Sequence, residues 1–233
     1  IETRLLIKKG SNWIGLPYIW NENQSDATLE IAGGNTLVNW IDTNNKLIEI
    51  EYSVPNVNQC IGCHSHNNQL KPLGPKLRNL NFTIQHNHEK INQITKWVEL
   101  GLLEDNYPYK EIKASIDYRD THSGTVDERA RAWLDVNCAS CHRLGGPAET
   151  SGLFLEFEQK NLKSLGVMKA PIAAGRGSGN FSYTIVPGEP DESIMVYRIN
   201  STDPGIMMPE LGRKLIHHEG LELIRQWIQE MNP

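Results

Sequence analysis

The sequence predicts a mainly α fold in two domains, preceded by a small antiparallel β-module. Three observations lead to this expectation: strand-like alternation confined to the first quarter of the chain, a capped helix near its middle, and an amphipathic helix near its end. We expect the β-module to cover residues 1–55, the first domain residues 56–122 and the second domain residues 123–233.

The β-module is predicted from period-two alternation and turn signals. Turn-forming residues at 33–35 and 42–45 divide this part of the chain into a three-stranded antiparallel meander. The expected strands are residues 27–32, 36–41 and 46–54. The module has no metal-ligand or nucleophile spacing, and we expect it to have no chemistry of its own. Because Ile1 already lies in an extended pattern, we expect the chain to lack earlier residues of its precursor.

Beyond Pro55 the strand pattern stops and helical patterns replace it. Two prolines and a glycine predict a loop at residues 71–75. A helix is then expected to end near Gly101, where a C-terminal glycine belongs. Its apolar face comprises Ile91, Ile94, Trp97 and Val98.

Two further helices frame the second domain. Thr125 and Glu128 have the spacing of a capping box, so a helix is expected to begin there and to run into Cys138. The last helix is predicted from apolar residues at helical spacing. These are Leu221, Ile224, Ile228 and Met231.

Composition and charge exclude several classes of protein. The chain is 39% hydrophobic and has no long apolar run, so neither a mainly disordered chain nor a transmembrane segment is expected. The formal net charge is -5, so we expect no nucleic-acid partner.

All four cysteines occur in two Cys-x-x-Cys-His motifs. The first motif, residues 60–64, contains Cys60, Cys63 and His64, and the second motif, residues 138–142, contains Cys138, Cys141 and His142. Such a motif is compatible with a redox dithiol, half of a zinc site, or covalent attachment of haem.

The histidine after each pair separates these alternatives. With 8 His in 233 residues, a chance His after both pairs has a probability of roughly 0.001. Neither a redox dithiol nor a four-cysteine zinc site needs that histidine. Haem attachment uses every residue, because the two sulfurs form thioethers with the haem vinyl groups and the histidine binds the iron. We therefore expect two covalently bound haem c groups, haem 1 and haem 2, and no disulfide.

The second half of the chain, residues 125–231, resembles a class I cytochrome c domain. Nearly the whole chain is similar to a family of bacterial dihaem c-type cytochromes, and the similarity is carried by seven stretches. These are residues 2–6, 16–27, 55–60, 73–76, 129–138, 173–179 and 207–213. The resemblance implies two cytochrome c-like domains and electron transfer, without naming a redox partner.

The sixth iron ligand of haem 2 is predicted to be methionine. Met208, directly before a proline, matches the pattern of similar cytochrome domains, and Met207 is the alternative. A guanidinium suits a carboxylate, so we expect Arg176 to pair with a propionate of haem 2.

Haem 1 lacks a nearby methionine, because none occurs before residue 168. The candidate distal ligands are His86, His88 and His122, whereas His66 is too close to His64 to reach the other haem face. A vacant sixth position is the other alternative.

These features predict a protein that carries single electrons between two redox proteins, a donor and an acceptor, rather than an enzyme. Covalent haem and the resemblance both imply the periplasm or the outer surface of a bacterium. Two alternatives are kept open. One is a dihaem peroxidase in which haem 1 reacts with peroxide. The other is the electron-exit domain of a larger dehydrogenase.

Overall fold

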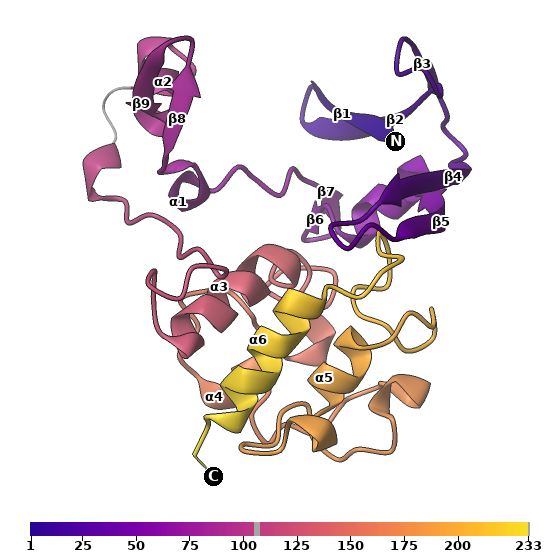
Figure 1. Cartoon of the computed structure of the whole chain (residues 1–233), viewed down its shortest axis with the longest axis vertical. Helices are drawn as coiled ribbons and strands as arrows, with labels where there is room; N and C mark the ends of the chain where they lie inside the picture. The colour runs from indigo at the N-terminus through magenta and orange to yellow at the C-terminus, as the bar shows by residue number, and fades with distance from the viewer. Residues whose placement is uncertain (105–107, 233) are drawn as a thin grey trace.

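A computed structural model describes residues 1–104 and 108–232 of the chain (Figure 1). Helices account for 28% of the protein and strands for 23%, with the strands in several small antiparallel sheets. The expectation of two mainly α domains is therefore wrong. Within the described ranges, no helix is long and apolar enough to cross a bilayer.

The β-module contains five strands in two sheets. The first sheet has the order β1 (Glu2–Lys9), β2 (Asn12–Trp20), β3 (Ala27–Leu29), and the second pairs β4 (Gly34–Ile41) with β5 (Leu47–Val54). All pairings are antiparallel. The β4–β5 hairpin confirms the last two expected strands, but the expected meander is wrong, because β3 pairs with β2 and not with β4.

Gly33 explains why the chain leaves the first sheet. Its φ is +73°, and a Cβ placed on it would lie 2.5 Å from the carbonyl oxygen of Val54. The backbone therefore turns sharply here and packs against the end of β5, a path open only to glycine. The Gly33–Gly34 pair marks a change of sheet, whereas the sequence pattern indicated a hairpin turn.

Residues 56–122 form short elements in two separate places. The first motif lies in η1 (Val57–Gly62) and is followed by the small hairpin of β6 (Ser65–His66) and β7 (Gln69–Leu70). The chain then crosses, through the predicted loop, to a second group of elements. These are α1 (Leu77–Leu80), β8 (Thr83–His86), β9 (Glu89–Asn92), α2 (Gln93–Glu99) and η2 (Tyr109–Glu111).

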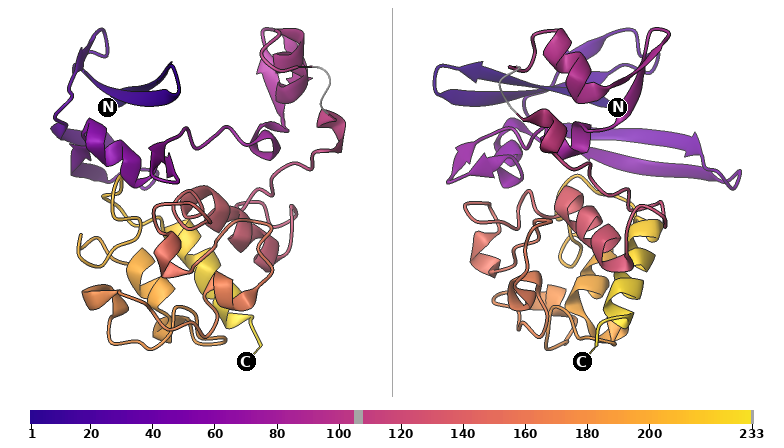
Figure 2. Two further views of the ribbon diagram at one scale, coloured as in Figure 1. Left: turned by 180° about the vertical axis from the view of Figure 1, so that it is seen from behind. Right: turned by 90° about the vertical axis from the view of Figure 1, so that its left-hand side faces the viewer.

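These two groups lie apart, above the C-terminal part of the chain (Figures 1 and 2). The helix predicted before Gly101 is confirmed as α2, with Gly101 at φ +69°, but α2 is only 7 residues long and Ile91 lies in β9. Short local hairpins have replaced the expected helices, so this segment has no helical core around the first motif.

Residues 123–232 pack around one apolar core. The predicted capping box is confirmed: the Thr125 side chain accepts from the Glu128 amide, and the Glu128 carboxylate accepts from the Thr125 amide. The predicted last helix is also confirmed, with Leu221, Ile224 and Ile228 buried. The helices and turns are α3 (Val126–Asn137), η3 (Glu149–Ser151), α4 (Leu162–Leu165), η4 (Gly175–Ser178), η5 (Pro190–Glu192), α5 (Ile194–Ile199) and α6 (His218–Gln229).

Helices α3 and α6 approach closely at Gly220. A Cβ at this position would lie 2.3 Å from the indole of Trp133, which is 5% exposed. The Trp133 indole N–H donates to Nδ1 of His217 at 3.1 Å, and the Trp227 indole N–H donates to Asp127 at 2.8 Å. The His217 ring, although partly exposed, therefore belongs to the contact between these helices.

We expect Gly220→Ala to destabilise the protein by about 1–3 kcal/mol, because the added methyl overpacks the Trp133 site. Chemical denaturation of this variant, compared with Glu222→Ala on the exposed face of α6, measures the effect. If Gly220→Ala is as stable as Glu222→Ala, the close approach of α3 and α6 is refuted.

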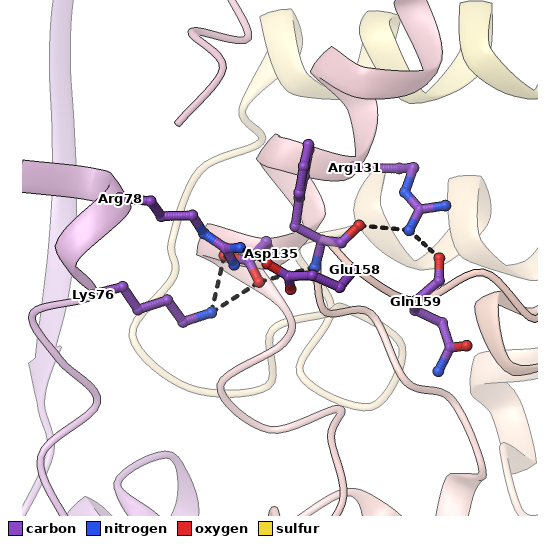
Figure 3. Close-up of polar contacts among 7 residues, drawn as sticks. Lys76, Arg78, Arg131, Asp135, Glu158 and Gln159 are labelled. Carbon is purple, nitrogen blue, oxygen red and sulfur yellow. Dashed lines mark hydrogen bonds and ion pairs between the residues drawn. The ribbon is translucent and has the colours of Figure 1, made fainter. Parts of the chain in front are cut away.

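A buried carboxylate joins the crossing segment to the C-terminal core (Figure 3). The Asp135 side chain, 2% exposed, accepts from Nζ of Lys76 at 2.8 Å and from Arg78 at 2.8 Å. It also accepts from the amide of Phe157 at 3.1 Å. Arg78 in turn lies over the Phe157 ring and pairs with Glu158. These contacts hold the chain that follows the first motif against α3.

Candidate haem-attachment site

The second motif opens onto a cavity of about 480 Å³, a size typical of cofactor sites. Both of its cysteines and His142 line the cavity, together with Met208 and Arg198. Apolar side chains complete much of the wall. Among them are Leu134, Leu153, Leu155, Ile194 and Ile199.

Helix α3 positions the second motif. Cys138 is the C-cap of this helix, and its amide donates to the Leu134 carbonyl at 2.8 Å. The next turn continues with the His142 amide, which donates to the Cys138 carbonyl at 2.9 Å. The capping box and the buried apolar face of α3 therefore place the two sulfurs and the imidazole on one side of a tight turn.

Ser151 sets the protonation of the His142 ring. The Ser151 hydroxyl donates to the Ala148 carbonyl at 2.6 Å, so its single proton is used there. It therefore accepts from Nδ1–H of His142, which lies 3.1 Å away, and it also accepts from the amide of Leu153. This leaves Nε2 of His142 as the nitrogen with a free lone pair, the form that binds a metal ion.

The surroundings of His142 favour its neutral form. Burial, and then the nearby positive charge of Arg198, lower the pKa of His142 to about 4. A neutral imidazole is what an iron ligand requires, because the protonated ring has no free lone pair. The second motif thus fits a covalently held haem in its sulfurs, its imidazole and the cavity beside them.

The structure distinguishes the two methionine candidates by position. Met208 lines the cavity, and its amide donates to the Arg198 carbonyl at 3.1 Å. Met207 is 7% exposed, and Met208 rather than Met207 contributes to the cavity wall. The position of Met208 suits the predicted sixth ligand.

Arg198, which the sequence did not indicate, occupies the place expected of Arg176. Arg176 lies on the surface and forms an ion pair with Asp203 at 2.6 Å. Arg198 lines the cavity, its Nε donates to the Ile206 carbonyl at 2.8 Å, and its nearest carboxylate, Glu210, is 3.6 Å away. Burial lowers the pKa of Arg198, as expected for a cation with weak compensation.

The glycine-rich segment that drew attention to Arg176 supports Arg198 instead. A Cβ on Gly177 would lie 3.1 Å from the Arg198 guanidinium, so the backbone of η4 packs directly on that group. The only sequence signal for Arg198 is a cation within the otherwise apolar helix α5. Ser151 had no signal, because its role depends on the fold of the loop after the second motif.

The first motif packs against the β-module, which therefore contributes to the site. Cys60 is 2% exposed, and a Cβ on Gly15 of β2 would lie 2.9 Å from its sulfur. Arg4 of β1 donates to the Cys60 sulfur at 3.3 Å and to the Pro55 carbonyl at 2.7 Å. Burial and the positive charge of Arg4 lower the pKa of His64. The first motif therefore has the donor set for haem, with its first sulfur covered by the β1–β2 hairpin.

The three predicted distal ligands of haem 1 are not brought to His64. His86 lies in β8 and His88 beside it in the β8–β9 turn, in the group of elements that stands apart from the first motif (Figure 1). The His122 side chain is 93% exposed and lies 3.2 Å from Asp120. Nδ1 of His64 is buried with no hydrogen-bond partner among the residues that the structure describes.

The two motifs contact each other through their second cysteines. The sulfurs of Cys63 and Cys141 share a hydrogen bond, and the Cys141 sulfur lies 3.6 Å from the Gly62 carbonyl. The hydrogen bond from Cys63 lowers the pKa of Cys141 to about 6, whereas burial raises that of Cys138 to about 12. All four cysteines are free thiols.

In the described ranges, residues 1–104 and 108–232, no group of three or more His, Cys, Asp or Glu side chains is placed to share one metal ion. The geometry thus lends no support to a zinc site. No protein-family model, curated protein or solved structure matches the chain. The resemblance to dihaem cytochromes therefore stays a prediction.

Proposed function

We propose that this protein is a dihaem c-type cytochrome that carries single electrons between redox proteins. One observation above all supports the proposal: His142, with Nε2 free, lines the same cavity as two cysteines and Met208. Two thiols, an imidazole and a thioether are the protein groups that such a haem requires. The bound haem would supply one-electron chemistry at its iron.

The residues of the second motif have distinct roles in this proposal. Cys138 and Cys141 form the thioethers, His142 is the proximal ligand and Met208 the distal one. Arg198 pairs with a propionate, since a guanidinium with a weak partner gains most from a carboxylate. The apolar wall excludes water, which together with the Met ligand raises the reduction potential of the iron.

The first motif is proposed to hold haem 1 through Cys60, Cys63 and His64. Because Cys60 is covered by the β1–β2 hairpin, this hairpin has to pack after the thioether forms. Covalent attachment also implies export to the periplasm or to the outer surface of a bacterium. The electron donor and the electron acceptor would be redox proteins of that compartment.

The haem content of the protein tests this proposal. We expect the chain, produced in a bacterium that attaches haem c, to carry two haems by intact mass and by its absorbance under denaturing conditions. Replacing both cysteines of either motif by serine should leave one haem. A protein without covalent haem, or one in which a double replacement leaves both haems, contradicts the proposal.

A second candidate function, peroxide reduction, is favoured by one observation. The three candidate distal histidines of haem 1 lie away from His64, on the β8–β9 hairpin or on the surface. A five-coordinate haem 1 would be open to peroxide. A high-spin ferric signal that is lost together with the first motif, and peroxide turnover, would support a peroxidase. Two low-spin haems without turnover would reject it.

A further inference from the structure

The contact between the two motifs involves equivalent positions in each. Cys63 and Cys141 are the second cysteines of their motifs, and their sulfurs are in hydrogen-bonding contact. Four residues further along each motif, the Asn67 amide donates to the Gly145 carbonyl at 2.9 Å. The two segments therefore meet through the same edge, as the two halves of an isologous interface do.

Close backbone approach supports this contact at both ends. Gly145 has φ +71°, and a Cβ there would lie 2.6 Å from the His66 ring and 2.7 Å from Asn67. At the other end, a Cβ on Gly62 would lie 3.3 Å from Leu211. Glycine at these positions lets the two backbones approach to a distance that other residues would prevent.

The first motif is also part of the wall of the second site. Gly62 and Cys63 line the same cavity as Cys138, Cys141 and His142. A haem held in this cavity would therefore lie against the first motif, and its edge at Cys141 would face the haem edge at Cys63.

We propose that the contact between Cys63 and Cys141 is the route by which an electron passes between the two haems. This inference rests on the proposed function and names haem 1 and haem 2 as each other's redox partners within one chain. After attachment, each sulfur is bonded to its own haem, so the two sulfurs in contact join the two macrocycles. One iron is oxidised from the ferrous to the ferric state and the other is reduced, with no proton or ligand transferred.

Paramagnetic resonance of the oxidised protein carrying both haems tests the proximity. We expect the spectrum to differ from the sum of the spectra of the two single-haem variants, because nearby unpaired spins interact. A spectrum equal to that sum would overturn this inference and leave the proposed function intact. Absence of covalent haem would instead contradict the proposed function itself.

A backbone variant tests the route without replacing a haem anchor. Gly145→Ala adds a methyl that collides with His66 and Asn67, whereas the matched control Gly188→Ala has a similar φ, +79°, and nothing within 4 Å. After one haem is reduced by a light pulse, we expect the exchange with the other haem to slow several-fold in Gly145→Ala only.

Only holoprotein with two haems is compared, and a Gly145→Ala variant that does not fold leaves the resonance measurement decisive. An exchange rate that is the same in wild type and in folded Gly145→Ala would overturn the inference. A wild-type rate that rises with protein concentration would do so as well, since the exchange would then run between molecules.

Discussion

Met208→Ala is expected to abolish the ferric charge-transfer band of a methionine-ligated haem and to lower the potential of haem 2. Met208 lines the cavity that His142 also lines, and a thioether ligand favours the reduced iron. Axial ligands set haem potentials over roughly 0.8 V, and we expect a fall on the order of 0.1 V. Optical redox titration and the near-infrared spectrum of the oxidised protein measure both effects.

Met207→Leu is the matched control for this prediction. Met207 is 7% exposed, and leucine conserves its volume, so this variant should keep both the band and the potential. If instead Met207→Leu loses the band and Met208→Ala keeps it, the assignment of the distal ligand is wrong.

Asp135→Asn is expected to destabilise the protein by about 2–3 kcal/mol at pH 7. The substitution leaves Lys76 and Arg78 without their carboxylate, and removing one partner of a buried ion pair costs about 3–5 kcal/mol. The lower figure allows for the partial exposure of both cations, which lets water solvate them. Urea denaturation of the two proteins gives the difference in the free energy of unfolding.

Glu158→Gln is the control for Asp135→Asn. Glu158 pairs with the same Arg78, but its side chain is 70% exposed, so its loss should cost less than about 1 kcal/mol. Equal losses in the two variants would show that the buried position of Asp135 is unimportant.

The stabilising effect of Asp135 should depend on pH in a defined direction. Burial alone raises the pKa of Asp135, but Lys76, Arg78 and the Phe157 amide outweigh it, so the pKa lies below its ordinary value. A depressed carboxyl pKa stabilises the folded state above the unfolded value, about 4, and this contribution is lost as the pH falls through the folded pKa. The stability difference between wild type and Asp135→Asn should therefore shrink below about pH 4. A difference that stays constant on acidification would refute the charge interaction.

Features set by neighbouring residues were predictable from the sequence. The Thr125–Glu128 capping box spans three residues, and the apolar periodicity of the last helix lies within one element. The alternation before Pro55 likewise predicted β5. In each case the physical cause acts along the chain, through hydrogen bonds or side-chain spacing that the order of residues already contains.

Features set by contacts between distant segments could not be predicted. A glycine doublet reads as a turn, and only the approach of Gly33 to Val54 shows that the chain changes sheet there. The fold class was wrong for a related reason. The short helical pattern before Gly101 does not reveal that α2 lies away from the first motif and builds no helical core there.

The same division applies to the candidate site. The two Cys-x-x-Cys-His motifs carry their own chemistry, since each places two thiols and an imidazole within five residues. Three-dimensional packing selects Arg198 over Arg176 beside the cavity and sets the His142 ring through Ser151. It also brings Cys63 against Cys141. Residue type and spacing identify the groups that bind a haem, whereas charge pairing, ring orientation and the contact between the motifs arise when segments far apart in the chain pack together.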